Sequence, residues 1–374
     1  MPRFIFELAT SEDNKELLEM LENGAFQGNI ALLYTRRPDP YISLQKEGEQ
    51  VDIVVCRDTV KEKIVGFGVC ALRKLFVNGK AEQVGYLFGL RIRQEYRRKF
   101  PLLHQGFEYL HALHHEHNIS FYLTTILADN LYAKKLLEKR RPFMPICVPY
   151  GTYDVYALKV PRVSARARDR RKQGLLPYVL RPAQKIDTPA LMRFLTEHGN
   201  KAQFFPVITA KDLQEGRISG ITATDFSLLC DEYNEILAAG VLWDQTAYKQ
   251  YLVQGYAGSL KCLYPFSRLF PSFGFPALPA PGKMLNFFTL SFWAVKDNNP
   301  DLFNRFLDAI PAGASTYPFF LIGVHETHPL KTVLQQRPHI KYTSTLYLVS
   351  WDEQRECIDR LDQQRWLYLE CGML

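Results

Sequence analysis

The sequence lacks most of the features that mark secreted, membrane-spanning and metal-binding proteins. Its seven cysteines are scattered, odd in number and never spaced as CxxC, which disfavours a zinc site or a disulfide framework. Cys70 and Cys230 lie inside apolar runs, as expected of reduced core thiols. The apolar runs are short: residues 317–324 are far fewer than the ~20 that a membrane helix needs. No apolar segment follows a basic start, so we expect no signal peptide and a cytoplasmic protein.

The composition is that of a foldable globular protein with only a mild charge. Hydrophobic residues make up 47% of the chain, aromatic residues 13% and charged residues 23%, so a core of ordinary size is expected. At roughly 150 residues per domain, the 374 residues suggest two domains. The net charge of +7 favours an anionic partner weakly. A phosphate-bearing cofactor satisfies that preference as well as a nucleic acid does.

The first half of the chain alternates between predicted strands and helices. An extended start leads to a helix that ends at Gly24, with apolar residues along one face. Two β-rich runs follow, and Asn78-Gly79 between them is a strong hairpin signal. Helical sequence from about Pro101 to His117, a strand, a second helix and closing strands complete this half.

The second half repeats this order of elements. "LNFFTLSFWAV" parallels "VGYLFGLRI", and "FFLIGVHETHPLKTVLQQR" parallels "YLTTILADNLYAKKLLEKR". We therefore predict two copies of one α/β unit, residues 1–160 and 179–374, rather than two unrelated domains. Residues 161–178 form a basic stretch that is read as a solvated linker. A polyanion contact is the alternative, but the stretch has no interleaved aromatic residues for stacking on bases.

Two segments of the first copy resemble the GNAT superfamily of acyl-CoA N-acyltransferases. In "GLRIRQEYRRKFPLLHQGFEYL", the residues that match the family's turn (approximately V-x-P-E-Y-R-G-K-G-I-G) are Ile92, Glu95, Tyr96, Arg97 and Lys99. In "ILADNLYAKKLLEKRRPF", the residues that match its later N-x-x-A-x-x-L-Y-E-K-L-G-F segment are Asn130, Ala133, Leu136, Glu138, Lys139 and Phe143. The resemblance covers about residues 1–160, and extends to 180–374 only through the order of elements.

The resemblance implies an α/β (mixed α+β) fold of two GNAT-like units, each a mixed, mostly antiparallel sheet flanked by helices. It also implies acetyl-CoA, or another acyl-CoA, as the cofactor of the first unit. A pyrophosphate needs convergent N–H donors, and a tight turn into a helix N-terminus supplies them with a favourable dipole. The residues that the resemblance places around the cofactor are Leu90, Ile92, Arg97, Arg98, Lys99, Phe100, Pro101, Leu102 and Asn130.

The sequence departs from the family at the phosphate turn. Phe100 and Leu102 stand where the family has glycines, and Pro101 between them removes one N–H donor. Arg97, Arg98 and Lys99 can supply charge-assisted hydrogen bonds instead, worth about 1.5–3 kcal/mol each. Two interpretations stay open: a cofactor site that uses more side chain and less backbone, or a site that has decayed.

A second departure concerns the catalytic acid. Many family members have a tyrosine where this chain has Leu137. Tyr132 lies five residues earlier on the same predicted helix and is a weak substitute as the proton donor; a packing aromatic is the alternative.

In the second copy, the turn "VKDNNPDLF" has neither arginine nor glycine, and Asp297 and Asp301 would repel a phosphate. We therefore expect no cofactor in this copy, which would serve as a wall of the acceptor cleft.

Three further stretches are candidates for binding. Residues 33–44 fall where the resemblance places the acceptor-contacting loop, so Arg36, Arg37 and Tyr41 are weak candidates for an acidic acceptor; a plain surface loop is the alternative. Residues 271–283 form a Pro/Gly-rich insertion with little charge, which suggests that it covers something apolar. "HALHHEHN" has two histidines at i and i+4 but no third ligand, so no metal is expected.

The sequence therefore predicts an acetyl-CoA-dependent N-acetyltransferase that acts on a primary amine, either a small molecule or a peptide. The acceptor amine would attack the thioester directly, with positioning supplying most of the catalysis. Two alternatives are kept: a catalytically silent GNAT-fold binding module, and an aminoacyl or acyl transferase that uses a carrier such as tRNA. No membrane partner is expected, nucleic acid is the less favoured partner, and the oligomeric state is open.

Overall fold

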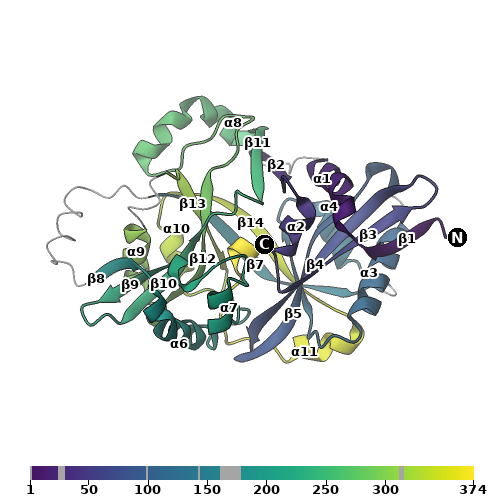
Figure 1. Ribbon diagram of the computed structural model, residues 1–374. Coiled ribbons are helices and arrows are strands. Elements are labelled where there is room, and N and C mark those ends of the chain that lie inside the picture. The colour runs from purple at the N-terminus through teal and green to yellow at the C-terminus, as the bar shows by residue number, and fades with distance from the viewer. Residues whose placement is uncertain (1, 24–29, 98–99, 142–143, 161–177, 311–315) are drawn as a thin grey trace.

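The computed structural model describes residues 2–23, 30–97, 100–141, 144–160, 178–310 and 316–374. Twelve strands form one mixed sheet with helices packed on its faces (Figure 1). Across the sheet they follow in the order β1 (Phe4–Leu8), β3 (Gln50–Asp58), β4 (Lys63–Val77), β5 (Lys80–Ile92), β6 (Tyr122–Leu127), β14 (His339–Ser350), β7 (Ile146–Lys159), β13 (Phe319–His325), β12 (Phe287–Val295), β10 (Ile236–Trp243), β9 (Phe226–Asp231) and β8 (Tyr178–Pro182).

The two halves of the chain build the two sides of this sheet in mirrored order. The first half gives β1-β3-β4-β5-β6 and the second gives β8-β9-β10-β12-β13, counted from the outer edges inward. In each set the last pair, β5 with β6 and β12 with β13, is parallel, whereas the other neighbours are antiparallel. The predicted fold class, two similar units with mixed, mostly antiparallel sheets, is confirmed.

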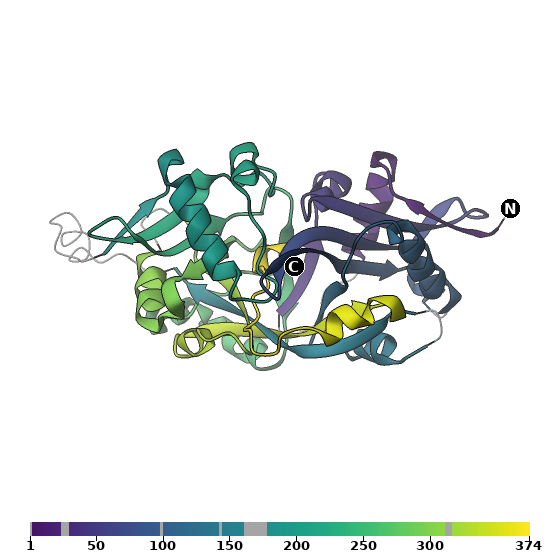
Figure 2. The same ribbon diagram turned by 90° about the horizontal axis from the view of Figure 1, so that it is seen from below.

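The central strands β14 and β7 are exchanged between the halves. β7, from the first half, pairs with β13 of the second half, and β14, from the second half, pairs with β6 of the first. The two exchanged strands also pair with each other from His339↔Leu158 to Ser350↔Ile146. Seen from below, the C-terminal part of the chain lies along the first half (Figure 2). The division into domains at residues 160 and 179 stays a prediction, and residues 161–177 of the linker lie outside the described residues.

The hairpin expected at Asn78-Gly79 is present and joins β4 to β5. Both residues have positive φ, 52° and 78°, as a two-residue hairpin turn requires. The register runs from Val77↔Lys80 at the turn to Gly66↔Ile92 at the far end. This long hairpin carries β5 into the middle of the molecule.

Helices flank the sheet on both halves. Those of the first half are α1 (Asn14–Glu22), α2 (Pro40–Gln45), α3 (Phe100–His114) and α4 (Leu131–Glu138). Those of the second half are α6 (Thr188–Gly199), α7 (Ala210–Glu215), α8 (Gly258–Leu263), α9 (Pro300–Ala309), α10 (Lys331–Gln335) and α11 (Arg355–Asp359). None of the helices in the described ranges is long and apolar enough to cross a membrane.

A separate two-stranded ribbon joins the halves above the sheet (Figure 1). It pairs β2 (Ile30–Thr35) of the first half with β11 (Gln250–Tyr256) of the second, in antiparallel register from Thr35↔Gln250 to Ile30↔Tyr256.

The halves also share a core with members on both sides. In it, residues of the first half pack with residues of the second: Leu75, Val84 and Phe121 with Phe204, Leu346, Leu348 and Leu367. Strand exchange, ribbon and shared core make the two halves one folding unit.

Candidate functional site

The parallel pair β5 and β6 separates soon after it begins. Its register is confined to Gly85↔Tyr122 and Tyr86↔Leu123. Gly85 is needed here because a Cβ atom would lie 2.3 Å from Cδ1 of Tyr122. Beyond Tyr86, Gly89 has a φ of +68° at a bulge in the pairing with β4. Residues 87–92 of β5 therefore form a strand edge that β6 does not cover, which we call the first strand edge.

Leu90 and Ile92, predicted to pair with a cofactor, both lie on the first strand edge. Leu90 is 42% exposed. Its carbonyl oxygen accepts a hydrogen bond from Nη1 of Arg91 at 3.2 Å, and that of Ile92 accepts one from Nε of Arg97 at 3.3 Å. Both carbonyls thus already have long, exposed arginine contacts, which a ligand can replace.

The turn after β5 leads into α3 as predicted, but its side chains divide between surface and core. Arg97 and Pro101 are exposed. Leu102 is 6% exposed and packs in the core with Tyr96, whose hydroxyl donates to Oδ2 of Asp58 at 2.9 Å. Leu102 therefore stabilises the start of the helix and does not face a ligand. Arg98 and Lys99, and the side chain of Phe100, lie outside the described residues.

The two candidates at α4 have different positions. Oδ1 of Asn130 accepts a hydrogen bond from the Ala133 N–H at 3.1 Å, so this side chain caps the helix. Tyr132 is 65% exposed, and its role as proton donor stays a prediction. Leu137, at the family's tyrosine position, packs against the core beneath α3 and β6.

The three predicted acceptor residues are not brought together. The Arg36 side chain is completely buried, and its Nη1 donates to the carbonyl and hydroxyl oxygens of Ser43 at 3.1 Å each. Arg37 points to solvent and pairs with Glu22 at 2.7 Å. Tyr41 packs against the core around α1. Among the three, Arg36 is the one placed in the interior between the two halves.

Arg36 belongs to a buried charge cluster that the sequence did not reveal. Its centre is Glu47, whose carboxylate contacts Arg36, Lys249 at 3.5 Å and Arg73 at 3.7 Å. Burial would raise the pKa of Glu47, but the three cations outweigh it and lower that pKa to about 2. Burial lowers the pKa of Lys249 to about 8 despite the attraction of Glu47. The cluster joins residues from both halves around one carboxylate.

The excess cations of this cluster hold the C-terminal segment of the chain. Nη2 of Arg73 donates to the carbonyl oxygen of Met373 at 2.6 Å. Nζ of Lys249 donates to main-chain oxygens of Gly372 at 3.3 Å and Leu374 at 2.7 Å. The last residues are thereby fixed between the cluster and the centre of the sheet.

Aromatic residues surround the cluster. Tyr34 of β2 and Tyr251 of β11 lie with ring centroids 5.2 Å apart beneath the ribbon. The guanidinium of Arg73 lies over the ring of Tyr86, 4.9 Å from its centroid. Tyr342 of β14 is 46% exposed, although burial by surrounding protein, Cys371 and Tyr86 raise its pKa. The raised pKa keeps the Tyr342 hydroxyl protonated at neutral pH.

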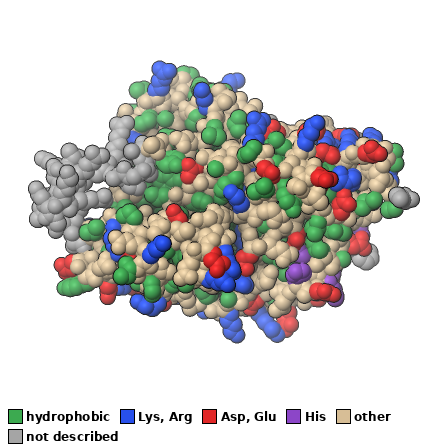
Figure 3. Space-filling model, in the orientation of Figure 1, with side chains coloured by type: hydrophobic (Ala, Val, Ile, Leu, Met, Phe, Trp, Pro, Cys, Tyr) green, Lys and Arg blue, Asp and Glu red, His purple; other side chains and the backbone are tan. Residues whose placement is uncertain are grey.

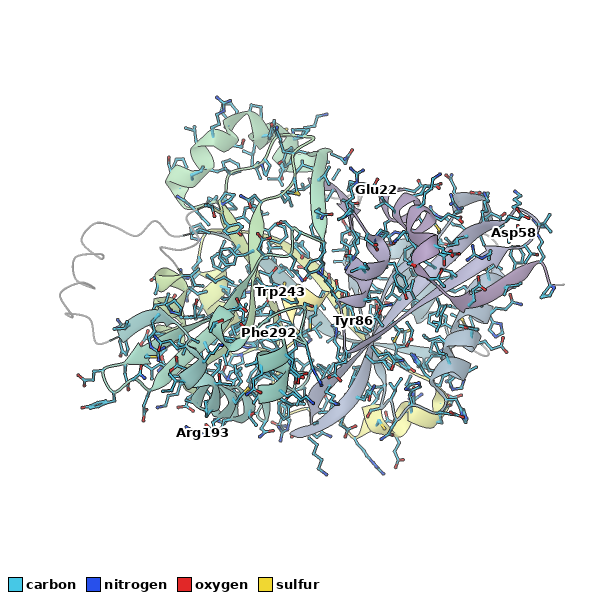
Figure 4. All side chains as sticks on the ribbon, in the orientation of Figure 1. Glu22, Asp58, Tyr86, Arg193, Trp243 and Phe292 are labelled. Atoms are coloured by element: carbon cyan, nitrogen blue, oxygen red, sulfur yellow. The ribbon has the colours of Figure 1, made fainter. Side chains whose placement is uncertain are left out.

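In the second half the corresponding strand edge is covered by the chain's own C-terminal segment. β12 pairs with β13 only from Phe287 to Thr289. Beyond that, the Phe292 N–H donates to Oε2 of Glu370 at 2.5 Å, and the Trp293 N–H donates to the hydroxyl of Tyr368 at 3.1 Å. Residues 290–295 form the second strand edge. Figure 4 shows Phe292 beside Trp243 here, and Tyr86 at the centre of the molecule.

The turn after β12 also differs from the one after β5. Oδ1 of Asn299 accepts the N–H groups of Asp301 at 2.9 Å and Leu302 at 3.1 Å. The first N–H groups of α9 are therefore already satisfied, and Asp301 adds a negative charge beside them. This arrangement disfavours an anion at the second turn.

Similar folds are known among solved structures, whereas no protein-family model and no curated protein matches the sequence. Saccharomyces cerevisiae N-myristoyltransferase with bound myristoyl-CoA aligns with a TM-score of 0.56 and 12% identity, over 93% of this chain and 83% of that chain. A GCN5-related N-acetyltransferase from Anabaena variabilis aligns with a TM-score of 0.51 and 11% identity, over 92% of this chain and 72% of that chain. A conserved protein of unknown function from Enterococcus faecalis, a probable N-acyltransferase, aligns with a TM-score of 0.50 and 8% identity, over 92% of this chain and 72% of that chain. The chain thus has a GNAT-like fold.

Proposed function

We propose that the protein is an acyl-CoA-dependent N-acyltransferase whose first half holds the thioester. The observation that carries this proposal is the first strand edge, which lies at the separated parallel pair and is followed by a basic turn and a helix. A pantetheine can pair with such an edge as an added strand does, through main-chain N–H and C=O groups.

The residues around the first strand edge fit a phosphate-bearing thioester. Leu90 and Ile92 offer main-chain groups, and Arg97 lies exposed at the turn before α3. The N-terminus of α3 favours negative charge. In the sequence it is preceded by two further basic residues, Arg98 and Lys99, which lie outside the described residues. When bound, the acyl-CoA would supply an activated acyl group. Because Leu102 faces the core, we assign phosphate binding to the basic side chains and the helix terminus rather than to a glycine nest.

The acceptor amine would enter beneath the β2–β11 ribbon. The aromatic rings of Tyr34 and Tyr251 line this side, and Tyr342 presents a protonated hydroxyl there. We place Tyr342 rather than Tyr132 beside the acceptor, because Tyr132 is exposed on the outer helix α4 whereas Tyr342 lies near Tyr86. The raised pKa of Tyr342 makes its hydroxyl a hydrogen-bond donor to the reacting groups rather than a strong acid. The buried cluster at Glu47 orients this wall. Acetyl as the acyl group and a primary amine, small or peptidic, as the acceptor are the finer part of the proposal.

Calorimetric titration with acetyl-CoA and with myristoyl-CoA tests the cofactor assignment. We expect one site per chain, and binding at least about tenfold weaker in Arg97→Glu, because a charge-assisted hydrogen bond becomes a repulsion. Lys296→Glu, at the turn of the second half, is the matched control and should bind normally. Absence of binding by either thioester at hundreds of micromolar, or equal loss in both variants, would refute the proposal.

A catalytically silent binding module is the second candidate. It is favoured by the side-chain contacts that Arg91 and Arg97 already make to the carbonyls of Leu90 and Ile92. Thioester binding without release of free thiol, measured with a panel of amines, would support it over the enzyme.

A further inference from the structure

The insertion between β11 and β12 carries an unusual share of the exposed apolar side chains. Of the 17 large hydrophobic residues that are exposed in the described ranges, six lie between residues 263 and 284. They are Leu263, Phe266, Leu269, Phe273, Phe275 and Met284, and we call them the apolar tip. The insertion projects from the ribbon at the edge of the molecule (Figure 1). Exposed apolar clusters of this kind mark contact surfaces.

The local helix type explains why three of these residues share one face. Residues Tyr264–Phe273 form a 3₁₀ helix, in which positions three apart lie above one another. Leu263, Phe266 and Leu269 follow that spacing and are 45%, 63% and 57% exposed. The intervening positions Tyr264, Ser267 and Phe270 point inward, and Ser267 is only 5% exposed. Leu263, Phe266 and Leu269 thus form an exposed apolar row, and Phe273, which is 71% exposed, follows at the end of the helix.

The inward face is fixed to the rest of the protein. The rings of Tyr256 and Tyr264 stack with centroids 4.7 Å apart. The Tyr256 hydroxyl donates to the carbonyl oxygen of Pro279 at 2.5 Å, and Nζ of Lys159 on β7 donates to that of Pro271. These contacts hold the helix in one orientation, so the apolar tip cannot turn inward without breaking them.

The charge around the apolar tip has one sign. No aspartate or glutamate occurs from residue 245 to residue 296. Lys261, Arg268 and Lys283 lie in the insertion and are exposed. Figure 3 shows Lys and Arg side chains on this projecting part of the molecule, among hydrophobic ones.

We propose that the apolar tip docks on an anionic lipid bilayer. A projecting face of leucine and phenylalanine with basic side chains at its border suits the boundary between headgroups and acyl chains. The insertion projects from the ribbon (Figure 1), so a flat lipid surface can reach it. The sequence had led us to expect no membrane partner. Surface docking needs no spanning helix, and it explains the apolar character of residues 271–283 without a covered surface inside the protein.

Vesicle co-sedimentation of the full chain tests this docking. One vesicle contains phosphatidylcholine alone and the other also contains phosphatidylglycerol. We expect binding to the anionic vesicles and weaker binding to the neutral ones. Phe266→Ser with Phe273→Ser should reduce binding by about tenfold or more, because two rings no longer leave water. Ile186→Ser with Tyr233→Ser is the control, since these residues are 82% and 80% exposed elsewhere in the second half.

A second double variant, Lys261→Glu with Arg268→Glu, tests the role of the basic side chains. About tenfold weaker binding is expected on anionic vesicles and little change on neutral ones, since attraction to the lipid charge is removed. The proposal is overturned if wild type binds neither vesicle, or if the serine pair and its control lose binding equally. It is also overturned if the serine pair abolishes a concentration-dependent dimer while vesicles do not bind, because the occupant is then a second copy.

Discussion

The two strand edges begin alike and end differently. In each half a parallel strand pair forms two or three residue pairs and then separates. At the second edge, the N–H groups of Phe292 and Trp293 are bonded by Glu370 and Tyr368 from the C-terminal segment. At the first edge, the half-buried Arg91 and the exposed Arg97 contact the carbonyls of Leu90 and Ile92.

The comparison indicates that the same strand edge can either be covered by the chain itself or stay available to bind a ligand. The second edge is covered by buried groups, and burial raises the pKa of Glu370 there although hydrogen bonds from Phe292 and Gly372 oppose it. Such a contact is costly to open, because a buried polar group would lose its partners. At the first edge the contact from Arg97 comes from an exposed side chain, which a ligand displaces at small cost, whereas Arg91 is half-buried. We therefore infer that the functional asymmetry comes from the C-terminal segment more than from the strands.

The largest loss of stability is expected from Glu47→Gln, at the charge cluster that holds the C-terminal segment. It leaves Arg36, Arg73 and Lys249 without their shared carboxylate and should lower the free energy of unfolding by about 3–5 kcal/mol. The pKa of Glu47 is lowered to about 2. The stability that its carboxylate contributes is therefore present at neutral pH and is lost as the pH falls from the ordinary pKa of a glutamate toward about 2. Denaturant unfolding with Glu49→Gln as control, an exposed residue near Lys74, checks this. The control should change stability by less than about 1 kcal/mol, and equal effects would contradict the prediction.

Gly85→Ala should damage the first edge more than the second. The added Cβ would lie 2.3 Å from the Tyr122 ring, so β5 and β6 must move apart, at a cost of about 1–3 kcal/mol. Thermal unfolding and thioester binding should both be impaired. Gly255→Ala is a suitable control because a Cβ there meets nothing within 4 Å; a variant at Gly85 as stable as this control would show that the close approach is unimportant.

Acid should loosen the covered edge through two histidines. Trp366, at the start of the C-terminal segment, lies 4.9 Å from His198 and 4.6 Å from His328, between ring centroids. Burial lowers the pKa of His198 to about 3, with Lys201 acting in the same direction. The unfolded histidine takes up a proton near pH 6.5, so stability is full above that pH and falls below it, by about 2 kcal/mol at pH 5.

Unfolding measured from pH 7 to pH 5 in wild type and in His198→Phe tests this effect. The variant should lose part of the pH dependence even if its stability at pH 7 is lower. An unchanged slope would assign the acid sensitivity to other groups, among which His328 has a pKa that burial and His198 also lower.

The smallest loss of stability is expected from Tyr368→Phe, at the second strand edge. It removes the hydroxyl that accepts the Trp293 N–H at 3.1 Å and donates to Oε2 of Glu370 at 2.8 Å, and should cost about 1–2 kcal/mol because both partners are buried. Hydrogen exchange should accelerate at the Trp293 amide, with little change at the first edge. Tyr233→Phe, a change on an exposed side chain, is the control. If hydrogen exchange at the Trp293 amide is unaltered in Tyr368→Phe, the C-terminal segment does not protect the second strand edge.

Local signals in the sequence were enough to predict the repeated unit. Asn78-Gly79 determines its hairpin through two positive φ values, and the helix after Pro101 begins where expected. These features depend on neighbouring residues, which is why composition and spacing reveal them. The placement of Leu90, Ile92 and Arg97 at a cofactor came instead from the resemblance to the GNAT superfamily, and that role stays a prediction.

The central features depend on contacts between distant residues and gave no local signal. Glu47 lies in "QKEGEQ", which has the composition of a solvated turn, yet it is buried because β4, β11 and the C-terminal segment converge on it. The resemblance to the GNAT superfamily placed Arg36 in a loop that contacts the acceptor, whereas its side chain is buried and bonded to Tyr34, Ser43 and Glu47. Tyr342 has no motif around it, and its place beside Tyr86 follows only from the exchange of β14.

The exchange of β7 and β14 means that neither half is complete when separated. A cut between residues 160 and 178 would leave an N-terminal fragment whose last strand pairs only with the other fragment, along both of its edges. The C-terminal fragment would likewise present β14 with no partner of its own. The two pieces should therefore remain associated after cleavage and, when produced separately, regain their structure only by assembling with each other. Within the single chain, each half therefore depends on the other for a complete sheet.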